Sequence, residues 1–100
     1  MANENALKIS REFAEAVKSQ FSNCRIYLFG SQIKGTFHKD SDIDIAVVLN
    51  NYENKSEMFL KLMQIRRKID SRIEPHPFRE SDFTESNQLV QEILEYGIEI

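Results

Sequence analysis

Apolar residues recur along the chain with two different periods, and these periods predict the secondary structure. Between residues 4 and 20 the apolar positions follow the spacing of one helix face, and Asn3 or Asn5 is placed to cap that helix. An apolar run over 25–29 is typical of a buried strand. Residues 42–49 predict a second strand, with Ile43, Ile45, Val47 and Leu49 on one face and Asp42, Asp44, Ala46 and Val48 on the other.

The second half of the chain also shows helix and strand patterns. The remaining predicted elements are a helix over 57–69 capped by Ser56, a strand over 71–78, a helix over 87–96 stopped by Gly97, and a short strand over 98–100. Two prolines in the strand over 71–78 place it at a sheet edge, because proline cannot donate to a strand ladder. This order predicts an α/β (α+β) fold, a small mixed sheet with helices packed on it in two layers.

The composition narrows the class of protein. One hundred residues with 41% hydrophobic and 29% charged residues suit a single globular domain over 1–100. A net charge of −3 disfavours a general nucleic-acid binder. A single cysteine, Cys24, excludes an intrachain disulfide and a Cys-rich zinc site. The chain shows neither a signal peptide nor an apolar stretch of membrane-spanning length, so we expect a cytoplasmic protein without membrane contact.

Gly30-Ser31 follows the first strand directly and opens a predicted helical turn over 31–35, which Gly35 closes. Glycine lets the backbone approach a bulky anion, and amide groups at the start of a helical turn point toward one. The serine hydroxyl adds a further donor. By itself, a Gly-Ser pair after a strand is most often an ordinary turn; in this context it is a candidate phosphate-binding turn. A polar loop is expected over 38–41.

Asp42 and Asp44 are separated by one residue at the start of an otherwise apolar strand. Strand side chains alternate, so both carboxylates lie on one side, roughly 6–7 Å apart. Two negative charges so placed favour a cation between them, and Mg²⁺ is commonly held by one or two carboxylates together with substrate phosphates. Two solvated surface aspartates are the simpler interpretation of this pair taken alone.

Ten residues separate Ser31 from Asp42, and the combined pattern Gly-Ser-x₁₀-Asp-x-Asp resembles the signature of the minimal nucleotidyltransferases (MNT), within the polymerase-β-like superfamily. The resemblance implies the minimal polymerase-β-like fold and transfer of a nucleoside monophosphate, such as AMP from ATP, to a hydroxyl. It implies two Mg²⁺ ions held by Asp42 and Asp44, and binding of the triphosphate by Gly30 and Ser31.

The resemblance extends to three further positions. The family places a third carboxylate, more usually an aspartate, on a following strand, and Glu74 matches that place with Asp70 as the alternative. Lys34 falls where a basic residue often meets the triphosphate, whereas Gln32 stands where arginine is frequent, which predicts one missing charge contact. His76 shares the face of Glu74 and is a candidate for acceptor contact, although a loop histidine without a role is the simpler reading.

Short stand-alone members of the family are typically encoded with a helical HEPN-type partner and act as its antitoxin, some by transferring AMP to a tyrosine of that partner. The resemblance therefore implies a protein acceptor. Two alternatives stay open: a small-molecule acceptor, as in aminoglycoside nucleotidyltransferases, and a non-catalytic module that binds a toxin. The sequence also leaves open whether the chain forms a homo-oligomer.

Overall fold

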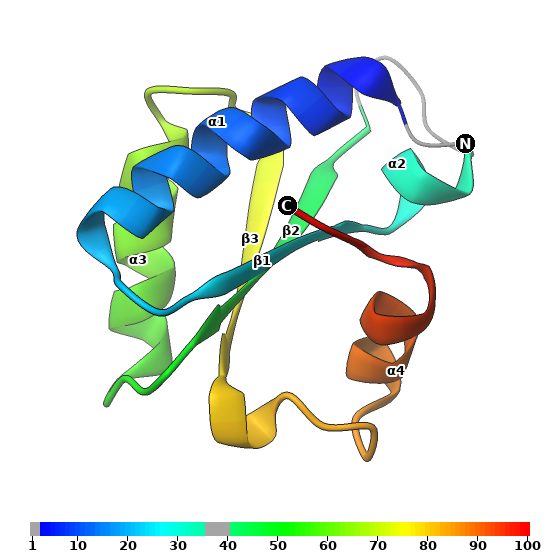
Figure 1. Ribbon diagram of the computed structural model, residues 1–100. Coiled ribbons are helices and arrows are strands. Elements are labelled where there is room, and N and C mark those ends of the chain that lie inside the picture. Colours follow the sequence, from blue (N-terminus) through cyan, green and yellow to red (C-terminus); the bar gives the residue numbers. More distant parts are fainter. Residues whose placement is uncertain (1–2, 36–40) are drawn as a thin grey trace.

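The computed structural model describes residues 3–35 and 41–100, and Figure 1 shows the arrangement of their helices and strands. The elements in chain order are α1 (Glu4–Gln20), β1 (Arg25–Phe29), α2 (Ser31–Lys34), β2 (Ile43–Leu49), α3 (Lys55–Arg66), β3 (Ile73–Arg79), a 3₁₀ turn η1 (Glu80–Asp82), α4 (Gln88–Tyr96) and β4 (Ile98–Glu99). Of the predicted loop over 38–41, only Ser41 belongs to the described residues.

The strands form one mixed sheet in the order β3-β2-β1-β4. β1 pairs antiparallel with both β2 and β4, whereas β2 and β3 run parallel. The parallel pair needs a crossover, which α3 supplies between β2 and β3. The proline-containing strand β3 lies at the sheet edge, as the sequence predicts.

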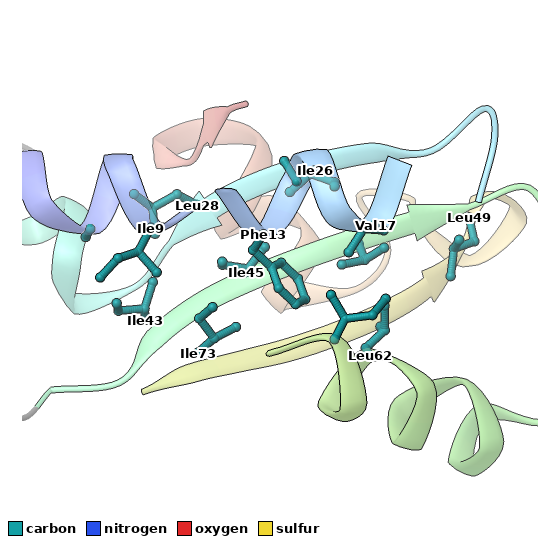
Figure 2. Packing of buried hydrophobic residues seen from close by; sticks show 14 of the residues in the cluster. Ile9, Phe13, Val17, Ile26, Leu28, Ile43, Ile45, Leu49, Leu62 and Ile73 are labelled. Carbon is teal, nitrogen blue, oxygen red and sulfur yellow. The ribbon is translucent and has the colours of Figure 1, made fainter. Parts of the chain in front are cut away.

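Helices cover both faces of the sheet, so the fold has three layers and the expected two-layer packing is wrong. α1 and α3 pack on one face, where Phe13, Val17 and Leu62 meet the odd-numbered side chains of β2 (Figure 2). On the opposite face, Val90 and Ile93 of α4 pack with Ala46 and Val48 of β2 and with Tyr27 and Phe29 of β1. The alternation along β2 therefore buries apolar side chains on both sides, and α4 takes the face that carries Asp44 (Figure 1).

Asparagines cap three of the helices, and one of them shifts a predicted boundary. The Asn3 side chain accepts from Asn5 N–H at the start of α1, and Asn87 does the same for α4. The predicted start of the third helix is wrong, because Asn54 rather than Ser56 is its cap, accepting from Glu57 N–H at 3.0 Å. Its predicted end at residue 69 is also too late, since α3 stops at Arg66 and the chain turns toward β3.

Candidate active site

The register of three strands brings the predicted site residues to one end of the sheet. Phe29, the last residue of β1, pairs with Asp44 because β1 and β2 are antiparallel. Asp44 in turn pairs with Glu74, because β2 and β3 run parallel and both begin at this end. Gly30 follows Phe29 directly. The candidate phosphate turn and two of the candidate carboxylates are therefore neighbours in space, although they span 45 residues from Gly30 to Glu74.

Gly30 fits against the carboxylate of Asp44. Its backbone has φ +83° and ψ −149°, a conformation open essentially to glycine alone. A Cβ added at Gly30 would lie 2.5 Å from Asp44 Oδ2, so any side chain here would collide with the carboxylate. Glycine at position 30 thus permits the backbone turn and leaves room for the Asp44 carboxylate.

The short helix α2 follows at once, as the sequence predicts. Ser31 is its first residue, and Gly35 ends it in the left-handed conformation at φ +77°. The backbone N–H groups of Ile33 and Lys34 donate to the carbonyl of Gly30 at 3.0 and 3.2 Å, which closes the turn. Gly30 and Ser31 therefore stand at the junction between a strand end and a helix start, where anions are commonly bound.

The carboxylates of the candidate site affect one another. Asp44 Oδ1 lies 3.1 Å from His76 Nε2, and Asp42 and Asp44 both raise the pKa of Glu74. The pKa of Glu74 is raised above its ordinary value by partial burial first, then by the Asp42 hydrogen bond and the charges of Asp42 and Asp44, while His76 opposes the rise. Partial burial, together with the neighbouring carboxylates, thus makes the Glu74 carboxyl hold its proton more tightly than usual.

His76 anchors Asp44 and is itself held by an aromatic contact. Its ring meets Phe29 edge-on, with ring centroids 5.0 Å apart. The side chains of His76 and Asp44 are 27% and 24% exposed, so their contact is partly shielded from water. The sequence had offered His76 as a contact for the acceptor, whereas the observed contact is with the second aspartate of the motif.

Asp70, the alternative third carboxylate, is engaged elsewhere. It accepts hydrogen bonds from Arg72 Nε at 3.1 Å and Nη2 at 3.0 Å, and from the Arg72 backbone N–H at 2.8 Å. Hydrogen bonding to Arg72 is the main reason that the pKa of Asp70 lies below its ordinary value. The geometry therefore favours Glu74 over Asp70 as the carboxylate that faces Asp44.

Two residues of α2 have partners that the sequence does not predict. Lys34 forms an ion pair with Glu92 of α4. Gln32 is buried, with 1% of its surface exposed, and its amide donates to the carbonyl of Asp42 at 3.2 Å. Its inward orientation depends on tertiary packing, and no pattern in the sequence signals it.

The carboxylate set fits Mg²⁺ by the chemistry of its donors, since oxygen ligands from Asp42, Asp44 and Glu74 suit a hard cation. In the part of the chain that the structure describes, no three His, Cys, Asp or Glu side chains converge closely enough to form a metal-binding cluster as they stand.

Comparison with protein families identifies the class to which the chain belongs. A family model described as "Nucleotidyltransferase domain" matches residues 10–99, and the chain belongs to that family. Comparison with curated protein sequences gave no match. No helix within residues 3–35 and 41–100 combines the length and apolarity needed to cross a membrane.

Solved structures with the same fold include three informative relatives. A toxin–antitoxin complex with AMP-PNP superposes with a TM-score of 0.67 at 24% identity, covering 90% of this chain and 70% of its own. A putative nucleotidyltransferase from Sulfolobus solfataricus gives 0.65 at 26% identity, over 95% and 78%. An MNT antitoxin in complex with the tri-AMPylated HEPN toxin of Shewanella oneidensis gives 0.63 at 20% identity, over 94% and 70%.

Proposed function

We propose that this chain transfers AMP from ATP to a hydroxyl group on a partner protein, as the MNT member of a pair whose other member is a helical HEPN-type protein. The observation that carries the proposal is the convergence of the motif at one end of the sheet. Gly30 lies against Asp44, Asp44 stands opposite Glu74, and the charges of Asp42 and Asp44 both raise the pKa of Glu74. Membership of the nucleotidyltransferase family supports the reaction class.

In this proposal the residues at the junction of β1 and α2 bind the triphosphate. Gly30 and Ser31 hold the β- and γ-phosphates, and Lys34 leaves Glu92 to meet their charge. The acceptor oxygen forms a bond to the α-phosphorus, and the bond from that phosphorus to the bridging oxygen of pyrophosphate breaks. Positioning and charge stabilisation supply most of the catalysis in such transfers.

The carboxylates would bind the metal ions and assist the acceptor hydroxyl. Asp42, Asp44 and Glu74 would hold two Mg²⁺ ions, which would neutralise the charge of the attacking and leaving oxygens. Glu74 would complete the metal site nearer the acceptor hydroxyl and favour its deprotonation. His76 holds Asp44 in place for the reaction.

The partner is proposed from the comparisons. Two of the structural relatives are antitoxin chains in toxin–antitoxin complexes, one with an ATP analogue and one beside an AMPylated HEPN toxin. ATP as the substrate agrees with the cytoplasmic location expected from the sequence.

The test uses ATP labelled separately at the α- and γ-phosphates, together with Mg²⁺ and the protein encoded beside this one. We expect only the α-label to appear on the partner, and intact-mass spectrometry should show the partner heavier by whole AMP units. Transfer of the γ-label would indicate a kinase. An unmodified partner together with efficient modification of an aminoglycoside would reassign the acceptor to a small molecule and leave the reaction class in place.

One observation favours a second candidate, a toxin-binding module without catalysis. The described carboxylates stand in pairs and form no three-ligand cluster. A module of this kind would neutralise its partner by contact alone, so its effect would survive replacement of Asp44 by asparagine. Loss of partner neutralisation in Asp44→Asn, with the complex still formed on a sizing column, would exclude it.

A further inference from the structure

Gln32 is a buried polar side chain at the start of the candidate phosphate turn. Within the described residues only Ser10 and Gln32 are polar and buried, at 0% and 1% exposed. Burying an amide costs free energy unless its hydrogen bonds are made inside the protein. Ser10 satisfies its hydroxyl within its own helix, by donating to the carbonyl of Ala6 at 2.7 Å. Gln32 instead forms its bonds to two other segments.

Both the nitrogen and the oxygen of the Gln32 side-chain amide form hydrogen bonds. Nε2 donates to the carbonyl of Asp42 at 3.2 Å and is 3.4 Å from that of Ser41, while Oε1 accepts from Asn3 Nδ2 at 3.1 Å. The backbone adds a further link, since Asn3 N–H donates to the carbonyl of Gln32 at 3.2 Å. One side chain thus joins α2 to the residues that precede β2 and to the cap of α1.

The Gln32 hydrogen bonds hold residues that lie just outside the paired part of β2. β2 begins at Ile43, so Asp42 lies one residue outside the paired strand, and its side chain is exposed. The covalent link between Ser31 and Asp42 runs through ten residues, which by itself leaves their separation free to vary. The Gln32 bond crosses this gap directly and ties the backbone of Asp42 to the helix that Ser31 opens.

We propose that Gln32 is a positioning residue for nucleotidyl transfer, which sets the place of Asp42 relative to the Gly30-Ser31 turn. The inference rests on the proposed function. Glutamine suits the task because it donates to Asp42 and accepts from Asn3 at once. Arginine, which is frequent here in the family that the sequence resembles, has donors only and would lose the bond from Asn3.

The test compares two variants that each remove a buried polar group. Gln32→Met keeps the length of the side chain and deletes its hydrogen bonds, whereas Ser10→Ala deletes one inside α1, away from the site. For Gln32→Met we expect kcat for AMP transfer to fall by roughly 10- to 100-fold, since small misplacements of reacting groups have effects of this size. Ser10→Ala should keep the kcat of the wild type.

A second readout needs no substrate. Backbone amide hydrogen exchange in the protein alone should accelerate at Asp42, Ile43 and Asp44 in Gln32→Met, while the amides of α3 keep their wild-type rates. If Gln32→Met does not fold, Gln32→Asn serves in its place, because its amide is one methylene too short for the same bonds. Its expected exchange pattern and loss of kcat are the same.

Equal kcat and equal exchange in wild type and the folded Gln32 variant would overturn the inference. Acceleration spread evenly over all elements would do so too, because it would mean a general loss of stability. If the wild type itself transfers no AMP, the proposed function fails and the positioning role in transfer fails with it. The exchange comparison then still reports whether Gln32 holds the backbone of Asp42.

Discussion

Gly30 and Asp44 are in such close contact that a Cβ on the glycine would lie 2.5 Å from the carboxylate oxygen Oδ2. This relationship joins the turn after β1 to the strand that carries the aspartates. It makes Gly30 sensitive for two reasons, its left-handed backbone at φ +83° and the space that Asp44 occupies. Gly35 shares only the first reason, with φ +77° and no described atom within 4 Å of an added Cβ.

The two glycines therefore form a matched pair of mutations. Gly30→Ala should lose about 1–3 kcal/mol of unfolding free energy, because its conformation excludes side chains. Gly35→Ala should lose about 1–2 kcal/mol for its left-handed backbone. Urea denaturation measures both values, and calorimetry with ATP and Mg²⁺ should show weakened nucleotide binding for Gly30→Ala alone. Unchanged ATP affinity in a folded Gly30→Ala protein would remove this glycine from the site.

Glu74 gives a prediction about pH. Its pKa is raised in the folded protein, so the folded state binds the proton more tightly than the unfolded state does. The free energy of unfolding should therefore decrease as pH rises from the ordinary glutamate value of 4.5 through the raised folded value, in the absence of metal. Glu74→Gln should flatten this part of the profile, and Mg²⁺ should restore stability at neutral pH.

Urea denaturation in chelator between about pH 4 and pH 7 measures this slope. The lower limit excludes Asp70, whose lowered pKa has the opposite effect: it contributes stability that is lost only as pH falls below the ordinary value of 3.8. A Glu74→Gln profile parallel to that of the wild type would show that Glu74 does not carry the excess negative charge of the site.

His76 provides a test of how Asp44 is held. Deleting its 3.1 Å contact in His76→Ala should weaken apparent Mg²⁺ activation by about 10-fold, the lower range for groups that orient a metal ligand. His76→Gln retains a donor and should lose less. Titration of transfer rate against Mg²⁺ concentration measures the effect. Equal losses in both variants would point to the packing of the ring on Phe29 as the important contribution.

Substitutions of Lys34 and of Glu92 are expected to change the KM for ATP in opposite directions. The ion pair between them is about half exposed on the lysine side, so it contributes little stability. If Lys34 meets the triphosphate, Glu92→Gln should free it and lower the KM for ATP a few-fold, whereas Lys34→Met should raise that KM. Steady-state kinetics with saturating acceptor measure both. A KM unchanged in Lys34→Met would leave Lys34 as a partner of α4 only.

Local patterns in the sequence were sufficient to predict much of the fold. The apolar run over residues 42–49 predicted β2, and the prolines of β3 placed that strand at the edge, with Glu74 in an extended conformation. Boundaries were harder to predict, because Asn54 and Ser56 are both good caps and only tertiary packing selects the first. The side of the sheet that α4 covers is likewise set by packing.

The contacts within the site depended on side-chain orientation, which no local pattern specifies. The amide of Gln32 turns inward because α1 and the start of β2 both offer partners to it. The contact between His76 and Asp44 arises from the parallel register of β3 on β2. In this register His76 stands opposite Ala46, which lies two positions after Asp44 along β2. Both residues are ordinary polar residues in the sequence, and their partners are distant along the chain.

The most direct test of the central claim measures Mg²⁺-dependent release of pyrophosphate from ATP in the presence of the partner protein, for wild type and three aspartate variants. Asp42→Asn and Asp44→Asn should lose roughly 100-fold or more in rate, because each removes a charge that the reaction needs. They should fold as well as the wild type without metal. Asp70→Asn, whose carboxylate pairs with Arg72, should keep the wild-type rate at temperatures where it is folded. Wild-type rates in Asp42→Asn and Asp44→Asn, or loss confined to Asp70→Asn, would contradict the account.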